Sequence, residues 1–131
     1  MLKTLVVDDN EEFRQSLVEK LCRCVPAIVI AEADCGKDAR QKIRTFTPNL
    51  VFMDIRLPDE NGLVISEQLK FHYPTIDIVV MSSFDLPEYR NAAVKIGAKY
   101  FLAKDSLHDG VSILLNNILQ QAHEKLNQNT Y

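Results

Sequence analysis

The sequence predicts an α/β fold in which five parallel strands form one doubly wound sheet with helices on both faces. Five apolar runs rich in β-branched residues occur along the chain, and they are continuous rather than alternating, as in strands covered on both sides. Stretches with helical periodicity separate them, and strict alternation of strand and helix favours a parallel sheet with right-handed crossovers. The 131 residues, 47% hydrophobic and 25% charged, suit one domain with its own core.

The predicted strands are the apolar runs themselves, and polar residues mark where three of them stop. The first ends at an acidic pair, the third at Asp54 and the fifth at Lys104. The five strands are predicted at Leu5–Val7, Ala27–Ala31, Leu50–Met53, Ile76–Met81 and Tyr100–Ala103.

The predicted helices follow from apolar spacing and from the positions of proline. In the first helix, apolar residues recur four apart from Phe13 onward. Pro48 and Pro74 prevent continuation of the second and third helices, while Pro87 suits the first turn of the fourth and Gly97 its C-terminal cap. The helices are predicted at about residues 13–25, 37–46, 63–71, 87–96 and 107–126.

Composition excludes several classes of function. The chain has 15 Lys and Arg against 18 Asp and Glu, a formal charge of −3, and no basic run, so we expect no direct nucleic-acid binding by these residues. Acids interrupt the opening apolar run after seven residues, which fits neither a signal peptide nor a membrane span. Cys22, Cys24 and Cys35 are interpreted as core thiols in a reducing compartment. A cytoplasmic protein without membrane contact is predicted.

Three acids follow the first and third predicted strands and raise an electrostatic question. Asp8 and Asp9 are adjacent and repel each other, although they could simply begin the next helix, whose N-terminal end tolerates anions. A strand order of 2-1-3-4-5 would place these strands side by side, at the point where α/β sheets bind ligands. Asp8, Asp9 and Asp54 would then converge, and a hard divalent cation such as Mg²⁺ would neutralise them.

The other strand ends suggest a type of chemistry. Ser82 and Ser83 follow the fourth strand and Lys104 follows the fifth, whereas no histidine lies at a strand end. A carboxylate nucleophile, a metal, a hydroxyl and an amine suit phosphoryl transfer, because that reaction requires mostly positioning and charge neutralisation. A carboxylate can itself take the phosphoryl group as an aspartyl phosphate.

These motifs together resemble the receiver domain of bacterial two-component response regulators. The similar stretches are VVDD, VFMDIRLPDENG, VVMSS and GAKYFLAKD, with Pro58 and Gly62 four and eight residues after Asp54. The resemblance covers residues 3 to about 122 and implies a flavodoxin-like (βα)5 fold. The strand-five region looks most like receivers that precede a helix-turn-helix output domain.

The resemblance implies a metal-dependent phosphoacceptor. Asp54 would take the phosphoryl group from the phosphohistidine of a sensor histidine kinase. Asp9, Asp54 and the backbone carbonyl of Arg56 would bind Mg²⁺ directly, and Asp8 would act through a metal-bound water. Asp54 as a helix or turn cap is the alternative without function.

The resemblance also implies catalytic and switch residues. Ser82 would donate a hydrogen bond to one phosphoryl oxygen and Lys104 would pair with another, while Phe101 matches the aromatic that turns inward as Ser82 moves. Each has a simpler reading: the adjacent Ser83 could replace Ser82, Lys104 could be a solvated lysine, and Phe101 could be core.

Three further positions bear on the geometry of this site and on the lifetime of its phosphoryl group. Many receivers have proline after the strand-five lysine, with a cis bond there, whereas this chain has Asp105, so the geometry of the Lys104–Asp105 bond stays open. Arg56 and Phe84 occupy positions that tune phosphoryl lifetime in the family. We hypothesise that these bulky side chains hinder water and give slow self-dephosphorylation.

The predicted organisation is a receiver domain at residues 1–126, followed at 127–131 by a frayed tail or the start of a linker. The sequence is compatible with a stand-alone regulator or with one that precedes a DNA-binding domain, and with a homodimer. The leading hypothesis is a signalling switch rather than a turnover enzyme. A Mg²⁺-dependent phosphohydrolase with an aspartyl nucleophile and a scaffold that is not phosphorylated are the alternatives.

Overall fold

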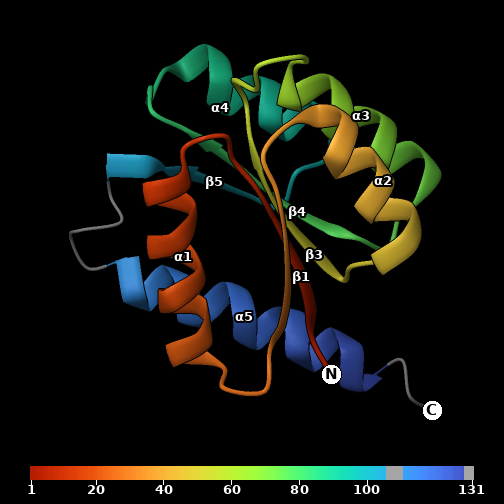
Figure 1. The fold of residues 1–131 in the computed structure, drawn as a ribbon, viewed down its shortest axis with the longest axis vertical. Helices are drawn as coiled ribbons and strands as arrows, with labels where there is room; N and C mark the ends of the chain where they lie inside the picture. The colour runs from red at the N-terminus through yellow and green to blue at the C-terminus, as the bar shows by residue number, and fades with distance from the viewer. Residues whose placement is uncertain (106–110, 129–131) are drawn as a thin grey trace.

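Five parallel strands form the centre of the molecule in a computed structural model that describes residues 1–105 and 111–128. Their order is β2-β1-β3-β4-β5, which confirms the predicted doubly wound fold (Figure 1). The strands are β1 (Lys3–Val7), β2 (Val29–Ala33), β3 (Leu50–Asp54), β4 (Asp77–Ser82) and β5 (Tyr100–Ala103).

The second strand begins two residues later than predicted. The N–H of Ile28 donates to the carbonyl of Val25 in the turn after the first helix, so Ala27 and Ile28 are not free to join the sheet. Pairing starts where the N–H of Val29 donates to the carbonyl of Leu2. Because β2 lies at an edge of the sheet, it is only partly buried, whereas β3 and β4 are fully buried. Its apolar run therefore suggested more burial than the strand has.

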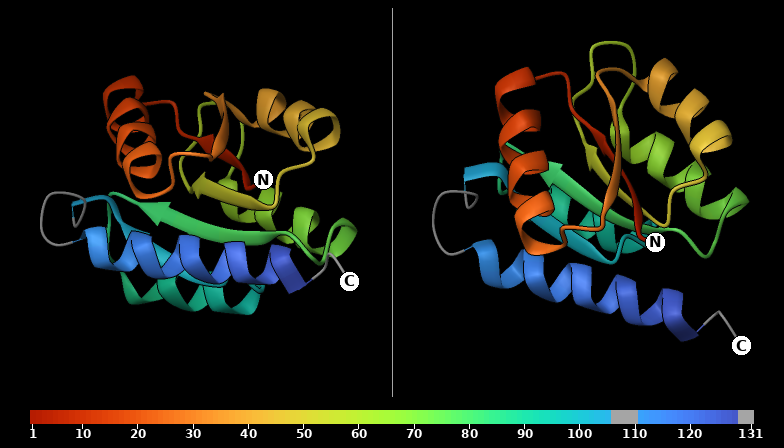
Figure 2. Two further views of the ribbon diagram at one scale, coloured as in Figure 1. Left: turned by 90° about the horizontal axis from the view of Figure 1, so that it is seen from below. Right: turned by 60° about the horizontal axis from the view of Figure 1, so that its bottom comes forward.

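Helices cover both faces of the sheet, as Figures 1 and 2 show. Leu17 and Leu21 of the first helix pack with Leu115 and Ile118 of the last in one core cluster. The three middle helices contribute to a second cluster on the opposite face. The helices are α1 (Glu11–Cys24), α2 (Gly36–Phe46), α3 (Gly62–His72), α4 (Pro87–Lys95) and α5 (Val111–Gln128). The predicted start of the last helix at Leu107 lies outside the described residues.

The prediction of core cysteines is wrong for Cys22 and Cys35, whereas Cys24 packs against the first core cluster. Cys22 is exposed, and Cys24 and Cys35 are only partly buried. The sulfur of Cys35 accepts a hydrogen bond from the N–H of Asp38 at 3.4 Å, so this thiol caps α2 instead of filling the interior. An N-cap side chain must accept a hydrogen bond from a backbone N–H of the first helical turn. The prediction treated cysteine as an apolar residue and did not consider its sulfur as an acceptor.

Gly62 allows α3 to start against the end of β3. A Cβ atom there would lie 1.9 Å from the carbonyl oxygen of Asp54, a backbone atom that cannot move without shifting the strand. We therefore expect Gly62→Ala to lower the free energy of unfolding by about 2 kcal/mol. Gly36→Ala is the comparison and should lose less, because its Cβ would meet side-chain atoms of Glu60, at 2.5 and 3.0 Å, and no backbone atom. Chemical denaturation showing equal losses in both variants would contradict this packing argument.

Candidate functional site

The three predicted acids converge at the carboxyl end of the sheet. Asp8 follows β1 and is fully buried, Asp54 ends β3 and is 4% exposed, and Asp9 is exposed beside them. Carboxylate oxygens of all three lie within 4.8 Å of one another. Asn10 caps α1 by accepting a hydrogen bond from the N–H of Phe13. The helix therefore starts after Asp8 and Asp9, and the alternative in which these acids begin it is wrong.

Backbone contacts fix the buried acid in place. The N–H of Asp8 donates to the carbonyl of Ala33 at 3.0 Å, which extends the pairing of β1 with β2 by one residue. One carboxylate oxygen of Asp8 accepts from the N–H of Asn10 at 2.9 Å. Its other oxygen, Oδ2, contacts the ammonium of Lys104.

Lys104 joins the two buried carboxylates across the sheet. Its Nζ lies 2.6 Å from Oδ2 of Asp8 and 3.0 Å from Oδ2 of Asp54. The side chain is 12% exposed and its ammonium lies 4.8 Å from the centre of the Phe13 ring. The structure thus places Lys104 inside the site, and the reading of it as a solvated surface lysine is wrong.

The charges in this cluster do not balance. Burial and the negative charge of Asp8 raise the pKa of Asp54 to about 6, although Lys104 opposes the shift. Burial alone would lower the pKa of Lys104, but its hydrogen bond to Asp8 and the charges of both carboxylates raise it overall. One ammonium cannot neutralise three ionised carboxylates. The excess of hard oxygen ligands suits a divalent cation such as Mg²⁺.

A cavity of about 360 Å³ opens beside this cluster. Ser82 is buried, and its Oγ accepts from the N–H of Phe84 at 2.9 Å, so the hydroxyl hydrogen stays available for a ligand. Ser83 also lines the cavity but is exposed. The lining residues are Asp9, Asn10, Asp54, Arg56, Ser82, Ser83, Phe84 and Lys104.

A stacked pair forms one rim of this cavity. The guanidinium carbon of Arg56 lies 4.5 Å from the centre of the Phe84 ring, and its Nη2 lies 3.4 Å from the hydroxyl of Tyr89 on α4. The sequence predicts Arg56 and Phe84 at this site but neither Tyr89 nor the cavity-lining Asn10. No pattern marks Tyr89, and the cap position of Asn10 before the first helix was the available signal.

Phe101 does not reach the cavity. It is partly buried, pairs in register with Val80, packs against the second core cluster, and carries the guanidinium of Arg90 4.6 Å from its ring centre. The Lys104–Asp105 bond, left open by the sequence, is trans.

Protein kept free of divalent cations is expected to lose stability as pH rises from about 4 to about 6. Asp54 binds its proton more tightly when folded, with a pKa of about 6, than at its ordinary value of 3.8. Folding therefore favours the protonated acid, and this contribution disappears as pH rises through the folded pKa. Relative to Asp54→Asn, the wild type should lose on the order of 2 kcal/mol. Denaturant titrations in chelator measure this difference, and parallel curves for the two proteins would refute it.

Comparison with known proteins identifies the class. The family model described as response regulator receiver domain matches residues 4–116. The chain therefore belongs to the response regulator receiver domains, the signalling domains of two-component systems. Within the part of the chain that the structure describes, no helix is long and apolar enough to cross a membrane.

The relatives include longer regulators. Response regulator GacA of Pseudomonas aeruginosa is 30% identical over 104 residues, and sensory transduction protein LytT of Bacillus cereus is 36% identical over 104 residues. Each match covers 79% of this chain but 49% and 42% of the relative, so the chain spans about half their length. The solved signal receiver domain of the DNA-binding response regulator merR from Colwellia psychrerythraea has a TM-score of 0.84 at 22% identity, covering 94% of this chain and 99% of that one.

Proposed function

We propose that this receiver domain is a phosphoryl-accepting switch in which Asp54 takes phosphate from a sensor histidine kinase. The observation that carries the proposal is the bridge of Lys104 between Asp8 and Asp54 beside an open cavity. A buried carboxylate at the floor of such a cavity can be approached by a phosphoryl group only if cations offset the combined charge. Lys104 supplies one positive charge, and the three carboxylates together offer the ligands for a divalent cation that would supply the rest.

The proposed reaction forms an acyl phosphate. An oxygen of Asp54 bonds to phosphorus as the P–N bond of the donor phosphohistidine breaks, and the imidazole keeps the bonding electron pair. Lys104 pairs with one phosphoryl oxygen, and Ser82 donates its free hydroxyl hydrogen to another. Mg²⁺, held by Asp9, Asp54 and the carbonyl of Arg56, with Asp8 acting through water, would neutralise charge on the transferring oxygens.

Signalling would follow from a change of population between two arrangements. Ser82 lies at the end of β4, and a new bond to a phosphoryl oxygen would favour a different loop before α4. Phe101 would then turn inward, away from Arg90, and alter the face made by α4, β5 and α5. We propose that this face controls an output partner or an attached DNA-binding domain and that it can also form a homodimer. We further propose that the chain acts in the cytoplasm and that these residues do not themselves contact nucleic acid.

Labelling with acetyl phosphate and Mg²⁺ separates the switch from its rivals. A switch should reach close to one phosphoryl group per chain and lose it slowly. Continuous release of phosphate would indicate the phosphohydrolase instead, and no incorporation would indicate the unphosphorylated scaffold. Intact-mass measurement together with a phosphate-release assay distinguishes the three outcomes.

The Arg56–Phe84 stack is expected to prolong the phosphorylated state. Phe84 lines the cavity, and its ring stacks on the guanidinium of Arg56. Phe84→Ala removes this ring and should open a path for water. We expect phosphate loss to accelerate several-fold, about 1 kcal/mol in the barrier. Phe71→Ala removes an 81% exposed ring that does not line the cavity and serves as the control. An unchanged half-life in Phe84→Ala would reject a shielding role.

A further inference from the structure

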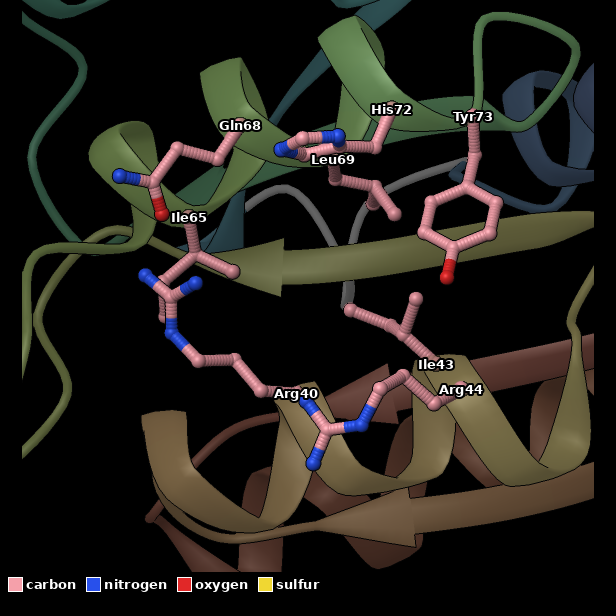
Figure 3. A pocket seen from close by; sticks show the side chains of 8 residues that line it. All are labelled: Arg40, Ile43, Arg44, Ile65, Gln68, Leu69, His72 and Tyr73. Atoms are coloured by element: carbon pink, nitrogen blue, oxygen red, sulfur yellow. The ribbon is translucent and has the colours of Figure 1, made fainter.

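A second cavity lies between α2 and α3 and shares no lining residue with the phosphoryl site. Its volume is about 250 Å³. Figure 3 shows side chains from the two helices facing each other across it, with the ring of Tyr73 hanging from the end of α3 toward Ile43. The volume is below the roughly 300–1,000 Å³ of pockets for drug-sized ligands, so it favours a small molecule.

The floor of this α2–α3 groove is apolar. Ile43, Ile65 and Leu69 are at most 4% exposed and belong to the second core cluster. All three line the groove with the little surface that the core leaves uncovered, and the Tyr73 ring forms a wall at one end. An apolar body placed here would exchange water for these surfaces.

The rim of the groove is basic and includes donors that the fold leaves unused. Arg40 is committed to Glu60, with Nη2 2.8 Å from Oε1. Among the described residues, by contrast, no side chain or carbonyl pairs with the guanidinium of Arg44, the amide of Gln68 or the hydroxyl of Tyr73. Each of these groups can donate a hydrogen bond.

The local charge reinforces this chemistry. Helix α2 carries four basic residues against one acid, and two further acids contact it, Glu60 at Arg40 and Asp59 at the N–H groups of its first turn, so its surroundings keep a net positive charge. None of the residues that line the groove is acidic. An anion is therefore attracted to this part of the surface, in contrast to the acidic end of the sheet.

We propose that the α2–α3 groove binds a small organic carboxylate with an apolar body. Its carboxylate would take two parallel hydrogen bonds from Arg44, whose planar guanidinium matches that geometry. The apolar body would lie over Ile43 and Leu69 against the Tyr73 ring. Inorganic phosphate lacks a group for the apolar floor, and a neutral analogue lacks a partner for Arg44.

Titration of the ¹⁵N-labelled chain with 4-phenylbutyrate tests the proposal by NMR. We expect saturable shifts of amide signals in α2 and α3, with a dissociation constant on the order of 1 mM for so small a ligand. Arg44→Gln should weaken binding at least tenfold, since a charge-assisted pair is lost. Tyr73→Ala should weaken it several-fold by removing the wall. Arg44 is exposed, so its variant keeps the fold. Arg23→Gln, on the exposed surface of α1, is the matched control and should bind as the wild type does.

Several outcomes would overturn the assignment. They are the absence of saturable shifts with 4-phenylbutyrate, equal binding by Arg44→Gln, or equal binding of 4-phenylbutanol or inorganic phosphate. Binding of a blocked acidic amphipathic peptide without binding of 4-phenylbutyrate would assign the groove to a protein partner and also overturn it. The labelling assay with acetyl phosphate is separate, so either proposal can fail alone.

Discussion

Asp54→Asn is expected to abolish phosphoryl incorporation from acetyl phosphate, reducing the labelling rate by at least about 100-fold, or roughly 3 kcal/mol in the barrier. An amide oxygen lacks the charge that makes the carboxylate a nucleophile, yet it still accepts a hydrogen bond from Lys104, so the fold should be retained. Intact mass spectrometry after incubation with Mg²⁺ measures the incorporation.

The matched control for this variant is Asp34→Asn. Asp34 is also a carboxylate just past a strand end, but it is exposed and lies outside the three-acid cluster. It should be labelled as the wild type is. Labelling that survives in Asp54→Asn, or that fails equally in Asp34→Asn, would mean that the phosphoacceptor lies elsewhere.

Lys104→Met is expected to cost on the order of 3 kcal/mol of unfolding free energy in the absence of divalent cations. The ammonium contacts a fully buried and a nearly buried carboxylate, and without it the two acids repel each other with no internal counter-charge. Methionine keeps most of the volume, so the loss is electrostatic rather than a cavity effect. Millimolar Mg²⁺ should restore part of this stability, because a cation replaces the missing charge.

Lys37→Met provides the comparison for a lysine on the surface. Its side chain is exposed and does not line the phosphoryl site, so its replacement should change stability by less than about 0.5 kcal/mol. Urea denaturation of both variants, with chelator and with Mg²⁺, decides between them. A loss in Lys104→Met no larger than in Lys37→Met would show that the bridge between the acids contributes little.

The sequence could reveal the sheet and the convergence of the acids because both follow from local patterns. Alternating strand and helix signals constrain the topology, and the order 2-1-3-4-5 brings the ends of β1 and β3 together. Asp8, Asp9 and Asp54 then need no further information to meet. Lys104 reaches them because it follows β5 directly, while β4 lies between.

Other features depend on side-chain directions that the sequence does not encode locally. The contact of Tyr89 with Arg56 joins α4 to the loop after β3, and no spacing along the chain indicates it. Phe101 packs beneath Arg90 instead of reaching the cavity, which is decided by how α4 lies on β5. The α2–α3 groove likewise arises from the gap between two helices whose core residues looked ordinary in the sequence.

The most direct measurement of the central claim is site mapping of the phosphoryl group. The wild-type chain is incubated with acetyl phosphate in Mg²⁺ or in chelator, and peptide fragmentation locates the modified residue. We expect one phosphoryl group on Asp54, formed only when Mg²⁺ is present. Modification of a different residue, or equal modification of Asp54 in chelator, would contradict a shared metal and phosphoryl site at the end of this sheet.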